Sequence, residues 1–137
     1  MVLEQLAAYS DYAALLLRIA IGILFVVHGY PKLFGKEMGL KKVAEFFKSV
    51  GITFAPLAAL VVGVLEFFGG LALIAGLLTR VIAALLAIQM VVALLVSKFK
   101  LKKAFSGGWE LDFLLIAALI ALAIIGAGMW AIDTNVS

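Results

Sequence analysis

Residues 12–34 read YAALLLRIAIGILFVVHGYPKLF, and this run decides the fold. At about 1.5 Å per helical residue, it is long enough to cross a hydrocarbon core about 30 Å thick. Three ionisable side chains interrupt it, namely Arg18, His28 and Lys32. At about 100° per residue they fall within roughly 80° of one another, and Gly22 and Gly29 lie on or beside the same arc. Because charges inside a membrane usually face protein or trapped water, this stripe predicts a first span covered by other helices.

The composition assigns the whole chain to the membrane class. Hydrophobic residues make up 66% of the 137 residues, and the mean hydropathy is +1.26. A soluble chain of this length cannot bury that much apolar surface, so we expect one integral membrane domain over residues 1–137. The chain has no cysteine and one histidine. This excludes a disulfide, an iron–sulfur cluster and a cysteine zinc site, and we expect no metal or haem site from this chain alone.

Hydrophobic runs predict an all-α, antiparallel bundle of four transmembrane helices, at about residues 12–34, 54–78, 80–97 and 109–132. Pro31 is expected to end or kink the first span because it cannot donate to the carbonyl of Val27. The second and third spans leave room only for a tight hairpin between them. Thr79 is the expected N-cap of the third span, and Ser106 or a neighbouring glycine that of the fourth.

Residues 36–50, which follow the first span, have a different pattern of apolar and charged side chains. Apolar side chains recur at helical spacing on one side, and lysines with one glutamate lie on the other. The segment is too short and too charged to span a bilayer, which favours a helix lying in the membrane interface. All the lysines lie in or beside the segments after spans one and three. By the positive-inside rule, these lysine-rich segments are predicted to be cytoplasmic and both termini external.

Glu66 is the strongest candidate for a functional residue, because it lies near the middle of the second span. Gly63 and Gly70 flank it on the same helical face, so it is expected to point into a helix–helix contact. An intramembrane carboxylate is by default a functional-site hypothesis, with a register-fixing ion pair as the structural alternative. From the estimated depths, Arg18 is the predicted partner of Glu66, and Gln89 or His28 the next candidate.

Other polar residues have plain structural interpretations. Lys32 is most simply an interfacial anchor, and Gln89 an interhelical hydrogen-bonding residue. Glu110 and Asp112 lie in the first turn of the fourth span, where the helix dipole stabilises acids. Arg80 lies at a helix N-terminus that disfavours a cation, so Asp11, Asp133 or a lipid phosphate is expected to compensate it. The basic segment after the third span lacks the interleaved aromatics that stack bases, which argues against nucleic acid.

Three stretches together resemble the DoxX family of small four-helix membrane proteins. They are LLLRIAIGILFVVHGYPKLFG (15–35), LEFFGGLALIAGLLTR (65–80) and GGWELDFLL (107–115). The family pattern falls on Arg18, His28, Gly29, Lys32, Glu66, Gly70, Gly76, Arg80 and Glu110. The resemblance implies membrane-bound, quinone-linked redox chemistry like that of the quinol oxidase and thiosulfate:quinone oxidoreductase subunits.

A quinone needs an apolar slot open to lipid and a few donors and proton carriers for its carbonyls. We expect Arg18, His28 and Glu66 to carry the chemistry, with Lys32, Gln89 and Glu110 helping to bind the ligand. The chain holds no visible redox centre, so a partner redox subunit or a homo-oligomer is an open alternative. The competing hypothesis is a non-enzymatic membrane binder or carrier of a small solute, or a scaffold for a redox assembly.

Overall fold

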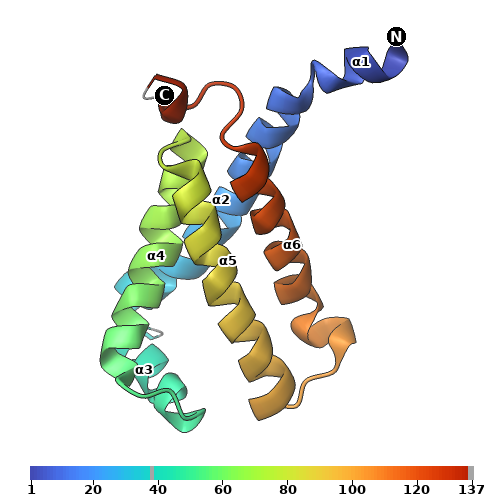
Figure 1. Cartoon of the computed structure of the whole chain (residues 1–137). Coiled ribbons are helices and arrows are strands. Elements are labelled where there is room, and N and C mark those ends of the chain that lie inside the picture. The colour runs from blue at the N-terminus through green and yellow to red at the C-terminus, as the bar shows by residue number, and fades with distance from the viewer. Residues whose placement is uncertain (38, 136–137) are drawn as a thin grey trace.

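The computed structural model describes residues 1–37 and 39–135, which are helical with short connections. The helices are α1 (Val2–Ala7), α2 (Ser10–Phe34), α3 (Leu40–Ser49), α4 (Ala55–Ala75), α5 (Thr79–Leu95), the π-helical turns η1 (Val96–Lys100) and η2 (Phe105–Trp109), α6 (Glu110–Ile125) and the 3-10 turn η3 (Ile132–Asn135). In the described part of the chain, four helical segments are long and apolar enough to cross a membrane. They form the predicted antiparallel bundle (Figure 1).

The two ends of the bundle differ in what they carry. Both termini lie at one end, which we call the terminal end (Figure 1). The segments 35–54 and 96–109 lie at the opposite end, which we call the lysine end because the predicted lysine-rich segments meet there. This arrangement agrees with four antiparallel crossings. Which end faces the cytoplasm stays a prediction from the positive-inside rule.

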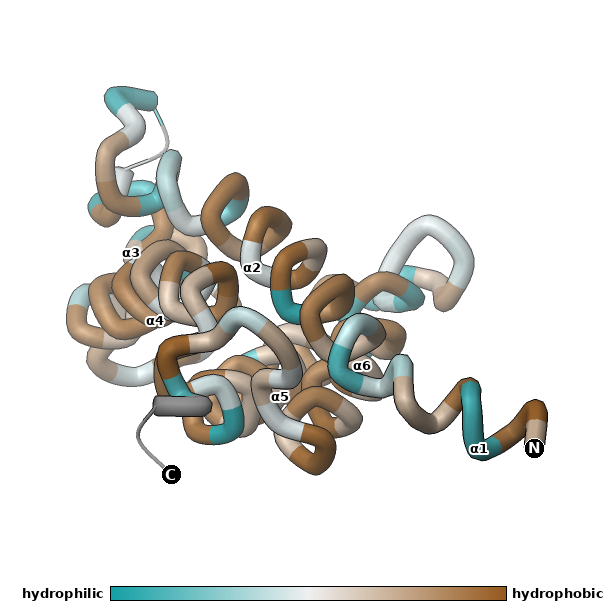
Figure 2. Tube along the Cα trace, turned by 90° about the horizontal axis from the view of Figure 1, so that it is seen from above, coloured by the Kyte–Doolittle hydropathy of each residue, from teal (hydrophilic) through white to brown (hydrophobic). Residues whose placement is uncertain are grey.

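The spanning helices are apolar along most of their length (Figure 2), and many of their large apolar side chains are exposed, as a lipid-facing surface requires. The interior is a cluster of alkyl and aromatic side chains contributed by all four spanning helices: Ile21, Phe25, Leu73, Ala83, Leu86, Ala87, Met90, Leu115, Leu119 and Leu122. The helices α2 and α4 pack closely on each other, and α5 packs mainly on α6. The space between these two pairs is therefore where a site with access from several helices can form.

Glycines set the register between α2 and α4. A Cβ atom on Gly22 would lie 2.7 Å from the carbonyl oxygen of Gly70, and one on Gly29 would collide with the backbone of Glu66 and Phe67. Because no side chain larger than hydrogen fits at these two contacts, the backbones approach closely and the alignment is fixed. The predicted role of the glycine face of the first span is confirmed. The register puts Glu66 beside Gly29.

The first helix passes through Pro31 and ends at Phe34, the predicted end of the first span, because loss of one hydrogen bond near a helix end is tolerated. One boundary differs clearly from the sequence prediction. The fourth helix ends at Ile125 rather than near 132, because Gly126 has a φ of +87° and turns the chain out of the helix. The predicted range 36–50 includes residue 38, and the predicted domain includes residues 136–137, all of which lie outside the described residues.

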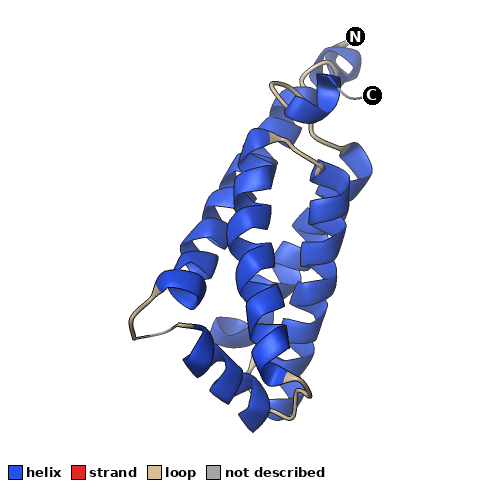
Figure 3. Ribbon diagram, turned by 90° about the vertical axis from the view of Figure 1, so that its left-hand side faces the viewer, coloured by secondary structure: helices blue, strands red, loops and turns tan. Residues whose placement is uncertain are grey.

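The helix α3 forms within the range predicted for an amphipathic helix. Its Val43 is buried, and Leu40 lies against α4 near Gly63. Lys41, Lys42, Glu45 and Lys48 are exposed on the other side. The helix therefore caps the lysine end of the α2–α4 pair (Figure 3). Its placement in the membrane interface remains an expectation from its amphipathic pattern.

Candidate functional site

Arg18 is completely buried and is held by backbone carbonyls at the terminal end. Its guanidinium donates five hydrogen bonds of 2.6–3.2 Å, to the carbonyl oxygens of Leu73, Ile74, Ala127, Met129 and Trp130. A guanidinium carries five N–H groups, so the number of bonds equals the number of donors. Arg18 therefore joins α2 to the end of α4 and to the chain that follows α6, and it has no donor left for a ligand without breaking this cage.

The predicted pair between Arg18 and Glu66 is wrong. The glycine contacts align Glu66 with Gly29, whereas Arg18 reaches the carbonyls of Leu73 and Ile74. Seven residues of helix separate Glu66 from Leu73, which is about 10 Å along the axis. The sequence estimate assumed that the two spans were centred at the same depth, and the actual register differs from that assumption.

Residues 126–133, which we call the C-terminal strap, cross over the hairpin between α4 and α5 (Figure 1). The Asp133 carboxylate accepts hydrogen bonds from the backbone N–H groups of Leu78 and Thr79 at 2.6 and 2.8 Å. Its own N–H donates to the Gly76 carbonyl at 2.9 Å. Gly76 has a φ of +72° and lies against the strap where a Cβ would meet Ala131. Asp133, not Thr79 as predicted, therefore caps α5.

Asp133 should make the terminal end sensitive to acid. Burial opposes ionisation of its carboxyl, but the hydrogen bonds from Thr79 and Leu78 and the charge of Arg18 outweigh it, so the pKa lies below the ordinary value. A lowered folded-state pKa means that the ionised group stabilises the fold above about pH 4 and loses that effect as the pH falls through the folded-state pKa.

We therefore expect Asp133→Asn to lower stability at pH 7 by about 1 kcal/mol, as loss of a helix cap does. The gap to the wild type should shrink when the pH is lowered to 3. Thermal unfolding in detergent at both pH values measures this. The control is Asp11→Asn at the same end, where the side chain is exposed. A gap for Asp133→Asn that is equal at pH 7 and pH 3 would contradict the cap.

Arg80 is compensated by backbone rather than by the predicted carboxylates. Its guanidinium donates to the carbonyl of Ile124 at 2.8 Å and more weakly to that of Ala123 at 3.5 Å. These carbonyls lie in the last turn of α6, where the negative end of the helix dipole attracts a cation. The positive charge of Arg80 is unfavourable at the N-terminus of α5, but it is favourable at the C-terminus of the neighbouring helix α6.

Glu66 lies in the middle of the bundle with two hydrogen-bond donors from different helices. Lys32 Nζ contacts its Oε2 at 2.5 Å, and Gln89 Nε2 contacts its Oε1 at 2.6 Å. The carboxylate is 6% exposed and the lysine 24%. Gln89, which with His28 was the predicted alternative to Arg18, does pair with Glu66. Lys32 is not a simple interfacial anchor, because it lies one turn beyond Gly29 on the face that meets Glu66.

A cavity of about 200 Å³ opens beside this cluster, between the two helix pairs. Its polar lining consists of His28 and Lys32 from α2, Glu66 from α4 and Asp112 from α6. The rest of the lining is apolar: Leu24, Phe25, Met90, Ala93, Leu111 and Leu115. His28 of α2 and Leu111 of α6 are exposed, so the cavity meets the surface between these two helices. We refer to it as the Glu66 cavity.

The structure thus groups part of the predicted site and separates the rest. His28, Lys32, Glu66 and Gln89 gather at or beside the Glu66 cavity. Arg18 lies in its carbonyl cage at the terminal end. Glu110 is exposed and accepts a hydrogen bond from the Gly107 N–H at 2.9 Å, within the turn that precedes α6.

Asp112 is the residue that sequence reasoning missed. Because Glu110 and Asp112 both lie in the first turn of the fourth span, the sequence predicted that both simply interact with the helix dipole. The two are distinguished by helical spacing, because Asp112 shares a face with Leu115 and Leu119, which are buried in the core. That face turns Asp112 into the cavity, whereas Glu110 stays at the surface.

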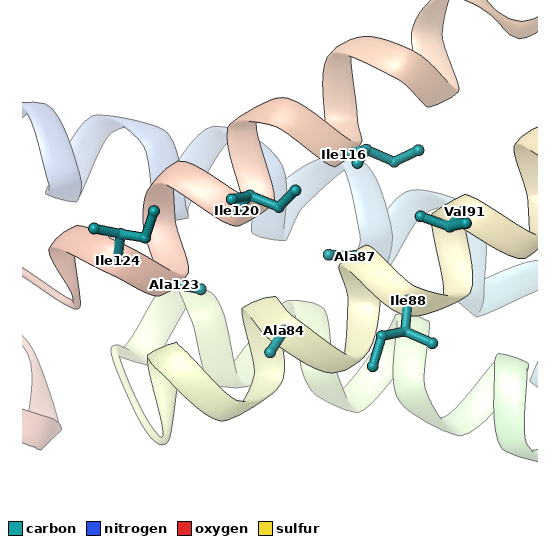
Figure 4. A pocket seen from close by; sticks show the side chains of 8 residues that line it. All are labelled: Ala84, Ala87, Ile88, Val91, Ile116, Ile120, Ala123 and Ile124. Atoms are coloured by element: carbon teal, nitrogen blue, oxygen red, sulfur yellow. The ribbon is translucent and has the colours of Figure 1, made fainter.

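A second hollow lies on the outer side of the bundle, away from the polar cluster (Figure 4). It is an open groove of about 370 Å³ between α5 and α6, with a lining of alkyl side chains: Ala84, Ala87, Ile88, Val91, Ile116, Ile120, Ala123 and Ile124. Such a lining suits an acyl or other hydrocarbon chain and offers nothing to a polar reacting group. The Glu66 cavity is therefore the candidate functional site.

Comparison with known proteins agrees with the membrane fold. The DoxX family model matches residues 13–98. "Putative oxidoreductase CatD" of Bacillus subtilis is 35% identical over 123 residues, covering 90% of this chain and 86% of that protein. "Uncharacterized membrane protein Rv3486" of Mycobacterium tuberculosis is 28% identical, with 96% and 86% covered. "Inner membrane protein YphA" of Escherichia coli is 30% identical over 56% of each chain. No solved structure matches the chain.

Proposed function

Because the chain belongs to the DoxX family of multi-pass membrane proteins, we propose that it is the quinone-binding component of a membrane oxidoreductase and holds the quinone headgroup in the Glu66 cavity. The observation that carries the proposal is the buried contact of Lys32 and Gln89 with Glu66 at the wall of this cavity. The relative from Bacillus subtilis that is named as an oxidoreductase supports the reaction class.

The residues present fit a small ring with oxygen substituents. Lys32 and His28 are potential donors to a carbonyl oxygen, and Glu66 and Asp112 are acceptors for a hydroxyl. Gln89 Oε1 is buried and has no hydrogen-bond donor among the described residues, so the cluster keeps an unused acceptor. The volume of about 200 Å³ suits a headgroup and excludes a long prenyl chain. The opening beside His28 and Leu111 leaves such a chain in lipid.

The cluster also explains how the site manages charge. The Lys32 ammonium neutralises the Glu66 carboxylate, and Gln89 fixes the orientation of that carboxylate from a third helix. When a quinone is bound, it supplies the two-electron chemistry, and the electrons come from a partner subunit or soluble donor. The protein's residues bind the headgroup, exclude bulk water and supply protons. The chain alone has no group that stores electrons.

The test is whether a quinone binds and whether binding depends on this cluster. Organic extraction of the purified protein should yield a quinone, and a short-chain benzoquinone should bind saturably to the stripped protein. Loss of a charged hydrogen bond to a ligand carbonyl corresponds to about 10- to 100-fold weaker binding. We expect at least that loss in the variant Lys32→Met/Glu66→Leu, and none in the control Lys36→Met, which changes an exposed lysine of the same end.

Two results would overturn the proposal. One is the absence of both extractable quinone and saturable binding in the wild type. The other is equal affinity in the wild type and in Lys32→Met/Glu66→Leu. Binding of a different small lipophilic solute in the same cavity, without any quinone, would instead support the non-enzymatic binder or carrier.

A further inference from the structure

We propose that Asp112 carries protons between water at the lysine end and the ligand held at the Lys32–Glu66 pair. The inference rests on the proposed function, because it assigns the proton route of the same site. Asp112 lies in the first turn of α6 and lines the Glu66 cavity. It is half-buried, and its turn of the helix directly follows the 96–109 segment of the lysine end.

The other polar neighbours of Asp112 lie on the segment between α5 and α6, at the lysine end. The Ser97 hydroxyl, in η1, and the Lys103 ammonium are the polar neighbours of its carboxylate on this segment. Ser97 is half-buried and Lys103 is exposed. The hydroxyl and the carboxylate thus form a polar connection from the surface of the lysine end to the cavity wall. The next acid along, Glu110, is exposed and occupied with the Gly107 N–H.

Glu66 cannot play this part as readily. Both of its oxygens already accept short hydrogen bonds, one from Lys32 and one from Gln89. Glu66 also lies deeper, in the middle of α4. Asp112 is the cavity carboxylate that is nearer to the lysine end, with its neighbours on the 96–109 segment.

The charged and titratable groups that face Asp112 come from three directions. They are His28 and Lys32 of α2, Glu66 of α4 and Lys103 of the segment between α5 and α6. From α5 the cavity is lined by Met90 and Ala93, which do not titrate. Lys32 belongs to the cluster at Glu66, whereas Lys103 is exposed on the segment at the lysine end. This arrangement suits a carboxyl group that gains and loses a proton in turn.

Reduction of a quinone to a quinol consumes two electrons and two protons, and the electrons come from the donor named above. In its acid form, Asp112 gives its proton into the cavity and becomes a carboxylate. The Asp112 carboxylate then takes a proton from water at the lysine end, where the Ser97 hydroxyl lies beside it. Two such transfers supply both protons. Oxidation of a quinol reverses the direction and releases two protons to the same water.

The experiment uses the full chain in a lipid film on an electrode, loaded with a short-chain benzoquinone. The electrode supplies the electrons, and the measured quantities are the reduction rate of the bound quinone against pH and the separate binding affinity. A positioned proton donor contributes about 10²-fold or more to a proton-transfer step. We expect Asp112→Asn to slow reduction by about that factor with unchanged affinity, Asp112→Glu to restore most of the rate, and formate to rescue Asp112→Asn.

The matched control is Glu110→Gln, which removes an acid two residues away but outside the cavity and should leave the rate unchanged. Unchanged reduction in Asp112→Asn, with normal quinone binding, overturns the inference and leaves the proposed function standing. Absence of quinone binding in the wild type overturns both. If Asp112→Asn does not fold, a wild-type rate in Asp112→Glu supports the route. Equal slowing in Asp112→Glu and Glu110→Gln contradicts it.

Discussion

Replacing Arg18 with leucine should destabilise the protein by about 4 kcal/mol or more, which is exceptional for one substitution. The change removes five hydrogen bonds and leaves the carbonyls of the C-terminal strap and of the end of α4 without their donor. Each buried acceptor left unpaired costs about 1–3 kcal/mol before relaxation. Arg18→Lys should recover only part of the lost stability. A lysine ammonium cannot reach the five carbonyl acceptors that the forked guanidinium of arginine reaches. Unfolding in detergent, monitored by temperature or denaturant, measures both.

The control for Arg18→Leu is Arg80→Leu. Arg80 is exposed and contacts only the last carbonyls of α6, so its loss should cost about 1 kcal/mol or less. The double variant Arg18→Leu/Glu66→Leu should show simple addition, within about 0.5 kcal/mol, because the two residues share no partner. Recovery of stability in that double variant would mean that they are coupled after all. A loss below about 1 kcal/mol for Arg18→Leu would contradict the carbonyl cage.

Lys32→Met should destabilise the protein by about 3–5 kcal/mol, since it leaves the Glu66 charge buried with only an amide donor. Glu66→Leu should cost less. Lys32 is partly exposed and can extend its ammonium toward the lysine end once the carboxylate is gone. The double variant Lys32→Met/Glu66→Leu should recover most of the loss, because no unpaired charge remains. The measurement is a double-mutant cycle of unfolding free energies in detergent.

The matched control for this cycle is Lys36→Met, which removes an exposed lysine near the same helix end and should change stability by less than about 0.5 kcal/mol. Combining Lys36→Met with Glu66→Leu should show no coupling. Strict additivity between Lys32→Met and Glu66→Leu is the result that would rule out their ion pair. Recovered stability without recovered quinone binding in that double variant would separate the structural from the functional part of the cluster.

The sequence predicted the four-helix architecture because each spanning helix is marked by a long apolar segment. Each span is a run of apolar residues long enough to cross a bilayer, and the face of Gly22 and Gly29 marked the packing side of the first span. Boundaries were harder where single residues decide them. The end of α6 depends on Gly126 adopting a positive φ. The backbone conformation of a glycine within an apolar run cannot be predicted from the sequence.

The candidate site was predictable as a set of residues but not as a set of partners. Helical spacing correctly placed Lys32 and Glu66 on faces that meet inside the bundle, whereas His28 lines the Glu66 cavity from an exposed position. Pairing depends on the axial register of α2 against α4. Arg18 and Lys32 lie about four helical turns apart on α2, so the register decides which of them reaches Glu66. That register follows from the contacts of Gly22 with Gly70 and of Gly29 with Glu66 and Phe67. A sequence shows that these glycines exist but not which one meets which.

The carbonyl cage of Arg18 has a consequence for how the chain is made. Arg18 enters the membrane with the first span, yet two of its acceptors are synthesised 55 and 56 residues later and the other three 109 to 112 residues later. Until the ribosome has released the last of them, the nascent bundle holds a cation that is incompletely solvated by protein. A chain that stops short of the C-terminal strap keeps that defect permanently. The buried arginine thus distinguishes finished from unfinished chains, and it gives membrane quality control a chemical difference on which to act.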